Sequence, residues 1–353
     1  MSAATMLRYE SDFSKVLAHG ETLASDGPQW LRDLRLRGLA NHRALGVPTP
    51  KNEEWKYTPL REVATLGLRP AETGPAVFDR DLPWSESCIR VLLVNGHLDR
   101  NQTDRPSVKG LRVLSICDAL REGLLEDTLG AIAKIDGHTF ASLSTALFEN
   151  GVFLHFSKGC AVEQTIEIVH LTSGDGQVVA PRVLIVAEEG ATAKIVETYL
   201  TDGRGTNLVL PVTEVSVARG ANIEHVRVGD ESLTTYSVAL WSVRQEDDSE
   251  YRSYNVCFGG AIARTDQEIW LGGQHIVTRL DGVVAARGGG STSITTRGST
   301  MRCLTATRSR STSRSWTTRR RWSLTARSSY TRTLRRPTLC RTTRRCSCPL
   351  ARR

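Results

Sequence analysis

The residues best suited to chemistry in this sequence are its eight cysteines, because thiolates bind metals and act as nucleophiles. No two are spaced as a Cys-x-x-Cys pair, and Cys346-x-Cys348 has no second pair or histidine near it. This spacing is weak evidence for a metal site. The four cysteines before residue 289 are widely scattered and are typical of buried thiols in a reducing cytosol; they are Cys88, Cys117, Cys160 and Cys257.

Histidines and acidic residues form no familiar catalytic motif. The sequence has no GxxxxGK[ST], HExxH or GxSxG pattern, so ATP hydrolysis by this chain itself is not expected. His155, His170 and His225 lie in or beside predicted strands, where a packed neutral imidazole is more frequent than a metal ligand. The acidic run at residues 247–250 indicates a solvated turn. A polysaccharide-cleaving enzyme with paired acids is an alternative, but the acids are spread out.

Strands that could position these residues begin after residue 150, where the apolar period changes to two. Residues 181–191 are followed 30 positions later by the similar residues 211–221, and each is succeeded by another short strand. A strand, a Gly-containing turn and a second strand recur here without intervening helices. This pattern is typical of stacked coils. The sequence therefore predicts a mainly β protein built on a parallel β-helix, with a β-sandwich as the alternative.

The first 150 residues are predicted to be mainly helical. Residues 26–28, Asp-Gly-Pro, start a helix that ends near residue 46, and further helical stretches are expected at 115–135 and 140–148. Between them, Trp55 and Tyr57 are expected to pin a polar loop to the core. We therefore expect a helical region at 1–150, a β-helix core at 151–288 and a separate tail at 289–353.

The tail has a composition unlike the rest of the chain. Residues 289–353 hold 17 Arg but no Lys, His or acid, whereas residues 1–288 carry a net charge of −9. Ser and Thr supply 26 of these 65 residues, and so little apolar surface predicts disorder. An authentic Arg-rich tail would favour nucleic-acid binding as an alternative function. The start of the chain shows no secretory signal and no apolar run reaches membrane-spanning length, so a cytoplasmic location is expected.

Three segments resemble the SufB/SufD family of iron–sulfur cluster assembly proteins: residues 52–58 (NEEWKYT), 143–155 (LSTALFENGVFLH) and 260–266 (GAIARTD). The resemblance implies an N-terminal helical domain, a right-handed parallel β-helix and a C-terminal helical segment. It also implies a non-catalytic scaffold subunit that pairs with a SufB-like subunit and a SufC-like ATPase. No cofactor is expected to be bound firmly, although an iron–sulfur cluster is expected at the level of the complex.

Site residues follow from the resemblance only in part. The family's His-containing stretch is replaced here by Ser, Thr and Arg, so no residue inherits its role. Cys257 is the best-placed remaining ligand, because iron–sulfur centres prefer cysteine, and its alternative is a buried core thiol. Arg264 and Asp266 are two positions apart on one strand face and are predicted to form a structural ion pair.

The abrupt onset of the tail suggests a change of reading frame near residues 288–290. Residues 290–296 can be encoded GGC AGC ACG TCG ATC ACC ACG, and these bases read from the third give Gln-His-Val-Asp-His-His, as in the family. The family's partner-binding segments would then lie largely beyond residue 288. We therefore expect the last coil to be uncapped, the chain to be poorly soluble and ATPase binding to be lost.

Overall fold

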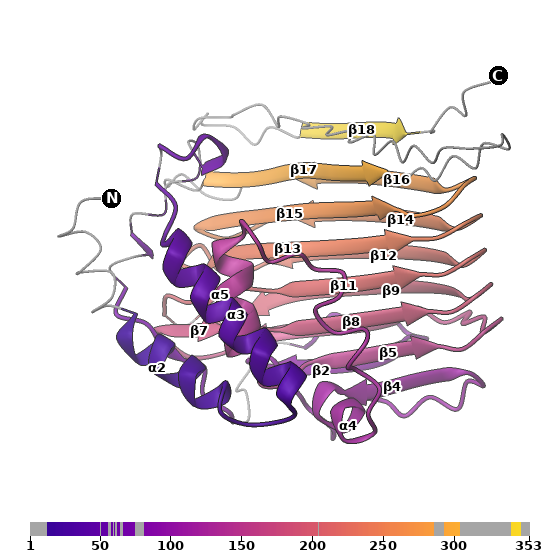
Figure 1. The fold of residues 1–353 in the computed structure, drawn as a ribbon. Helices are drawn as coiled ribbons and strands as arrows, with labels where there is room; N and C mark the ends of the chain where they lie inside the picture. Colours follow the sequence, from indigo (N-terminus) through magenta and orange to yellow (C-terminus); the bar gives the residue numbers. More distant parts are fainter. Residues whose placement is uncertain are drawn as a thin grey trace, which may run out of the picture.

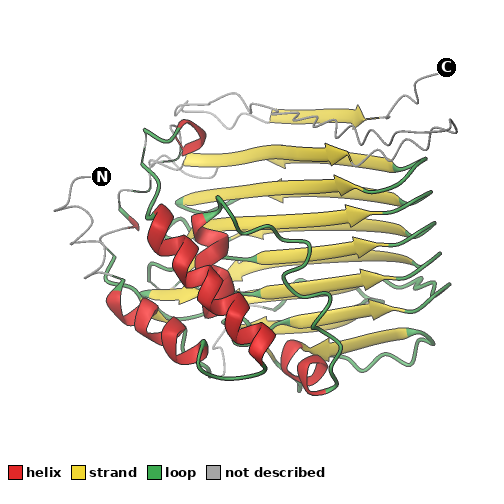
Figure 2. Ribbon diagram, viewed as in Figure 1, coloured by secondary structure: helices red, strands yellow, loops and turns green. Residues whose placement is uncertain are grey.

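The computed structural model describes residues 13–49, 51–55, 58, 60, 62–63, 66–74, 81–203, 205–285, 293–303 and 340–346. It is a parallel β-helix of about five turns, with helices packed against one side (Figures 1 and 2). This confirms the predicted mainly β class and the stacked coils. The helices are α2 (Ser14–Leu23), α3 (Gln29–Leu45), η1 (Glu53–Trp55), α4 (Ile116–Arg121) and α5 (Thr139–Leu147).

Two sheets form the long walls of the β-helix. Sheet A has the order β1-β7-β10-β13-β11-β8-β5-β4, with β15 and then β17 extending it beyond β13. Its strands are β1 (Arg69–Pro70), β4 (Leu111–Ser115), β5 (Val152–Phe156), β7 (Gln177–Val179), β8 (Arg182–Ala187), β10 (Leu208–Val209), β11 (Val212–Val217), β13 (Tyr236–Gln245), β15 (Ile262–Leu271) and β17 (Ser293–Cys303).

Sheet B has the order β18-β16-β14-β12-β9-β6-β2-β3. Its strands are β2 (Ile89–Val94), β3 (His97–Leu98), β6 (Ile166–Thr172), β9 (Thr192–Thr201), β12 (Asn222–Asp230), β14 (Glu250–Cys257), β16 (Val277–Val284) and β18 (Cys340–Cys346). The predicted 30-residue repeat corresponds to β8–β9 followed by β11–β12, which pair in parallel without a register shift.

Side-chain alternation explains why these strands close around a core. In β12 every second residue is buried, from Ile223 to Gly229, and β14 repeats the pattern. Successive side chains of a strand point to opposite faces, so one set fills the interior and the other faces outward. In the first coils the interior is apolar, with Ile166, Ile168 and Ile195 fully buried.

The helical layer covers the outer face of sheet A. Helix α3 crosses α5 closely at Gly38, where a Cβ would lie 2.6 Å from the Ser142 carbonyl oxygen. The helix starts after Pro28 and ends at Gly46, as predicted. No described helix has the length and apolar character needed to span a membrane.

The predicted helix at 115–135 is wrong over most of its length. Helix α4 ends at Arg121, because Gly123 adopts a left-handed conformation (φ 71°) that stops it. Leu125 and Leu129 are nevertheless buried, in a loop that packs on the outer face of sheet A. Their helical spacing reflected burial, not helical structure. Tyr57, the second predicted anchor of the polar loop, lies outside the described residues.

Two stretches of the tail form strands in the structure. β17 pairs in parallel with β15, and β18 pairs antiparallel with β16. The expectation that the coil before residue 288 has unpaired backbone is therefore wrong for β15 and β16, and the end strands of the two described sheets are β17 and β18. An exposed strand edge can pair with another strand through its backbone, whatever the side chains are. The rest of the tail, for which disorder is predicted, lies outside the described residues.

Candidate functional site

The interior of the β-helix becomes polar from β9 onward. The carboxylate of Glu197 accepts hydrogen bonds from Tyr199 (2.6 Å) and Thr213 (3.2 Å) and contacts the imidazole of His225 (2.9 Å). His170 lies 3.4 Å from the second carboxylate oxygen and stacks on the Tyr199 ring. Five residues of this interior, each at most 3% exposed, are called the Glu197 cluster: His170, Glu197, Tyr199, His225 and Tyr251.

The electrostatics of the Glu197 cluster favour an ionised carboxylate. Burial alone would raise the pKa of Glu197, but the adjoining imidazoles of His170 and His225 outweigh it and hold that pKa well below its usual range. Burial and the Glu197 charge raise the pKa of Tyr199 and Tyr251 well above the ordinary value. The Tyr251 hydroxyl lies 3.1 Å from His225 Nδ1, so Tyr251, His225 and Glu197 are linked by a continuous chain of hydrogen bonds. This chain holds the inward-facing side chains of neighbouring coils in fixed positions.

Cys257, the predicted ligand, is the last residue of β14 and points into this interior. It is 4% exposed, and its thiol donates a hydrogen bond to the Gly259 carbonyl (3.5 Å). Burial raises the pKa of this thiol to about 11, which disfavours the thiolate that binds metals. Among the described residues, no three His, Cys, Asp or Glu side chains come together in an arrangement that could hold a metal ion. Cluster binding by Cys257 stays a prediction.

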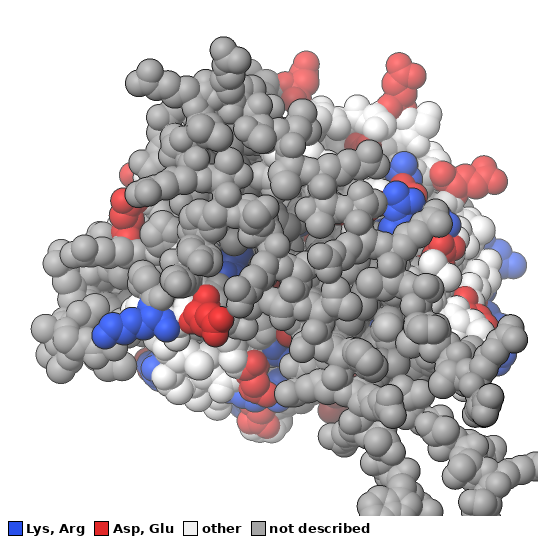
Figure 3. Space-filling model, turned by 90° about the horizontal axis from the view of Figure 1, so that it is seen from above, with Lys and Arg blue, Asp and Glu red and all other residues white. Residues whose placement is uncertain are grey.

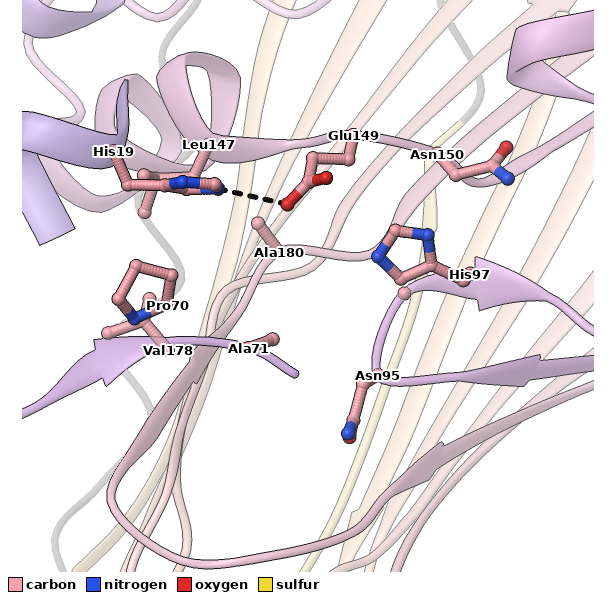
Figure 4. A pocket seen from close by; sticks show the side chains of 11 residues that line it. His19, Pro70, Ala71, Asn95, His97, Leu147, Glu149, Asn150, Val178 and Ala180 are labelled. Carbon is pink, nitrogen blue, oxygen red and sulfur yellow. Dashed lines mark hydrogen bonds and ion pairs between the residues drawn. The ribbon is translucent and has the colours of Figure 1, made fainter. Parts of the chain in front are cut away.

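A small pocket lies where the helical layer meets the first coils (Figure 4). The Glu149 carboxylate lies between the rings of His19 and His97, and His19 Nε2 is 2.9 Å from it. Burial lowers the pKa of His97, against the opposing charge of Glu149. The cavity of about 20 Å³ is large enough for one water molecule and too small for an organic ligand.

Two braces tie the helical layer to the β-helix. Glu214 on β11 is fully buried, is paired with Arg182, and accepts backbone hydrogen bonds from Gly130, Ile132 and Ala133. The Arg182–Glu214 brace therefore holds the loop that replaces the predicted helix. Sequence reasoning missed it, although a Glu within an apolar strand is a visible signal.

The second brace joins two of the segments singled out in the sequence. The Arg264 guanidinium lies 3.9 Å from the centre of the Trp55 ring, and it pairs with Asp266 at 2.9 Å. The predicted ion pair is therefore present. Arg264 is only 2% exposed, so the loop around residue 55 is fastened to a late coil of the β-helix.

In the one face shown in Figure 3, the described side chains form no basic patch that would favour the nucleic-acid alternative. In the face shown in Figure 3, the described basic and acidic side chains are intermixed around the periphery. The acidic run at 247–250 lies in a turn with Asp247 and Asp248 exposed, as predicted.

Two family models match the chain in succession. One is described as "SufBD protein N-terminal region" and matches residues 9–168; the other, "SUF system FeS cluster assembly, SufBD core domain", matches residues 170–316. The second match continues past residue 288 into the tail.

Three curated relatives are similar to this chain, and two of them are named iron-sulfur cluster assembly protein SufD. The chain is 22% identical to iron-sulfur cluster assembly protein SufD of Escherichia coli (strain K12), over 67% of this chain and 55% of that protein. It is 26% identical to SufD of Bacillus subtilis (strain 168), over 84% and 70%. It is 29% identical to protein ABCI7, chloroplastic, of Arabidopsis thaliana, over 70% and 54%. The chain thus spans little more than half the length of two of these relatives.

Proposed function

The chain belongs to the SufB/SufD family of iron–sulfur cluster assembly proteins, and we propose that it acts there as a SufD-like, non-catalytic scaffold subunit. The observation that carries the proposal is the contact between Arg264 and Trp55, because it joins two family-like segments that are 209 positions apart in sequence. With the Arg182–Glu214 brace, it supports one rigid body in which helices and β-helix hold fixed positions. Rigid positioning is what a scaffold contributes.

The proposed partners are a SufB-like scaffold subunit and a SufC-like ATPase, acting in the cytoplasm. The absence of a P-loop motif from the sequence fits a subunit that relies on a separate ATPase. The iron–sulfur cluster is cargo of the complex in this proposal. Cys257 is kept as its candidate ligand in this chain, because iron–sulfur centres favour cysteine.

We further propose that the tail impairs this function. The Arg-rich composition from residue 289 replaces the segment through which the family resemblance places partner contacts. Sequencing the gene across the codons for residues 288–316 tests the frame change, and it must reach codon 316 because the core match extends that far. An uninterrupted reading frame overturns this part of the proposal.

Co-purification tests the function. The chain as written and a version restored to the family's frame are each co-expressed with a SufB-like subunit and a SufC-like ATPase. We expect the restored version to retain both partners and to restore cluster assembly in cells lacking their own SufD. Failure of the restored version to bind either partner contradicts the scaffold role, and equal binding by both versions contradicts impairment by the tail.

A further inference from the structure

One position in the β-helix interior is less filled than its neighbours. Gly229 on β12 lies in register between Tyr199 on β9 and Cys257 on β14, and it faces inward with them. A methyl group built on Gly229 would lie 3.7 Å from Cys257 Sγ and 3.8 Å from Glu231 Oε2. These are ordinary contact distances, so a methyl group fits at this position. We call this space the Gly229 gap.

The backbone does not require glycine at this point. Gly229 is not among the described residues with a left-handed backbone. Glycine in a strand interior is unfavourable by itself, and often marks a place where something approaches closely.

Buried polar atoms without a protein partner occur on residues that are neighbours of Gly229 in the sequence or in the ladder. Asn255 is 3% exposed, and neither its side-chain oxygen nor its side-chain nitrogen has a hydrogen-bond partner in the protein. Arg227, opposite Asn255 in the parallel ladder, has an unpartnered Nη2, and Glu231 has an unpartnered Oε1. These are two donors and two acceptors. Each such group costs free energy unless something completes its hydrogen bonds.

The carboxylate of the neighbouring Glu197 cluster differs from these unpartnered atoms. It is satisfied by protein groups, namely Tyr199, Thr213 and His225. Unpartnered atoms also occur elsewhere in the interior, at both ring nitrogens of His170 and at Trp241 Nε1. The residues near the Gly229 gap differ in that they combine two donors with two acceptors. A mixture of donors and acceptors, with Arg227 and Glu231 of opposite charge, suits a neutral ligand that can both donate and accept.

We propose that the Gly229 gap is a buried water-binding site, in which one or more ordered water molecules bridge Arg227, Glu231 and Asn255 beside the Cys257 thiol. Water has the required size and supplies both donors and acceptors. The site would make this part of the β-helix interior hydrated, whereas the interior of the first coils is lined by apolar side chains. It also gives the buried thiol of Cys257 a polar neighbour.

Whether Gly229→Ala raises or lowers the stability of the folded state tests the site. In an empty gap, Gly229→Ala would fill a void and stiffen a strand, and the folded state would become more stable. With bound water, the new methyl group displaces it and leaves Arg227, Glu231 and Asn255 unpaired. We expect the folding equilibrium constant, from urea unfolding, to fall by about tenfold or more.

Gly282→Ala is the matched control, since Gly282 also lies in a strand and a Cβ there meets only the Asn255 carbonyl oxygen, at 3.5 Å. It measures the ordinary effect of alanine in a β-strand of this protein. A fall for Gly229→Ala beyond that of the control supports the site. A gain in stability for Gly229→Ala overturns it.

A double-mutant cycle and a crystal structure complete the test. Asn255→Leu removes the unpaired amide at nearly constant volume, so Gly229→Ala should cost less in that background. Equal costs in both backgrounds would overturn the bridging role of Asn255. A high-resolution crystal structure should place water within hydrogen-bond distance of Arg227 Nη2 and the Asn255 amide, and a map without such density would also overturn the site.

Discussion

At the scale of single residues, buried charges fasten distant parts of the chain together. Glu214 is the clearest case, because it is fully buried and its partners come from a loop more than 80 positions earlier and from a neighbouring strand. Its carboxylate neutralises Arg182 and satisfies three backbone N–H groups that would otherwise be buried without acceptors.

We predict that Glu214→Ala lowers the free energy of unfolding by about 3–5 kcal/mol, because it leaves the Arg182 charge buried and unpaired. Urea unfolding followed by circular dichroism measures the change. Glu21→Ala is the control, since Glu21 pairs with Arg43 at the surface and should leave the unfolding curve unchanged. Similar losses in both variants would contradict the special role of the Arg182–Glu214 brace.

The Arg264–Asp266 pair can be compared with a near copy on the next strand along the chain. Asp266→Ala should lower the free energy of unfolding by about 1–3 kcal/mol, because Arg264 is buried against Trp55 and loses a charged partner. Arg279 and Asp281 on β16 have the same spacing but a more exposed arginine, so Asp281→Ala should have a smaller effect. An effect of Asp266→Ala below about 0.5 kcal/mol would rule out a structural role for the pair.

Protonation of one buried histidine should make stability depend on pH. Burial lowers the pKa of His42 to about 4, although its Nδ1 is hydrogen-bonded to the Thr139 carbonyl (2.9 Å). Between pH 6.5 and 4 the unfolded chain therefore binds a proton that the folded chain does not, and stability falls as pH falls through this window. The loss should reach about 3 kcal/mol at pH 4.

His42→Gln should flatten this pH dependence, as measured by urea unfolding at pH 7, 6 and 5. His275→Gln is the control, because His275 is exposed and its removal should leave the slope unchanged. An unaltered slope in His42→Gln would mean that other groups carry the pH dependence.

Single residues also show which contacts can be predicted from the sequence and which cannot. Arg264 and Asp266 could be paired in advance, because two positions on one strand share a face. Glu197 could not be assigned partners, since His170 and His225 are 27 and 28 positions away and meet it only after the coils stack. Local spacing carries no information about which residues stacking brings together.

At the scale of elements, the strands were predictable because period-two alternation and a 30-residue repeat agree. The helix expected at 115–135 was not formed, because apolar spacing alone cannot distinguish a helix from a loop that packs its leucines inward. Gly123 and Gly130, both left-handed in the structure, were the available signal against a long helix.

On one ridge of the β-helix, stacked turns carry four charges of alternating sign, on Lys158, Glu189, Arg219 and Asp248. Lys158 contacts Glu189 (2.7 Å), and Arg219 lies near Glu189 and 3.6 Å from Asp248, which contacts His275 (3.1 Å). Each of the five residues comes from a successive coil. This turn ladder favours the observed register, since sliding one coil along its strands would move its charge away from the oppositely charged partners on the adjacent coils.

We predict that Arg219→Glu lowers the urea midpoint at low ionic strength, because it inserts a third carboxylate between Glu189 and Asp248. The difference from the parent chain should shrink in about 0.5 M salt, which screens exposed charges. Arg37→Glu on the exposed side of α3 controls for the change in net charge. A loss that does not respond to salt would show that the turn ladder is not electrostatic.

At the scale of the whole molecule, the decisive feature is the end of the β-helix. A solenoid exposes the edges of its last strands unless something pairs with them, and exposed edges associate with one another. In this chain β17 pairs with β15 and β18 with β16, so two short stretches of an otherwise Arg-rich tail occupy both edges. Sequence composition did not indicate this, because strand pairing at an edge depends on backbone groups that every residue has.

Removal of residues 286–353 should therefore make the protein self-associate. The truncated chain keeps β15 and β16 but loses both strands that cover them, and its unpaired N–H and C=O groups can then pair with another copy. Sedimentation velocity over a range of concentrations should show a monomeric full chain and concentration-dependent oligomers of the truncated one. Val283→Lys, which places a charge on the exposed edge strand, should suppress this association. A truncated chain that stays monomeric at all concentrations would contradict the protective role of β17 and β18, and a full chain that associates equally would contradict their pairing in solution.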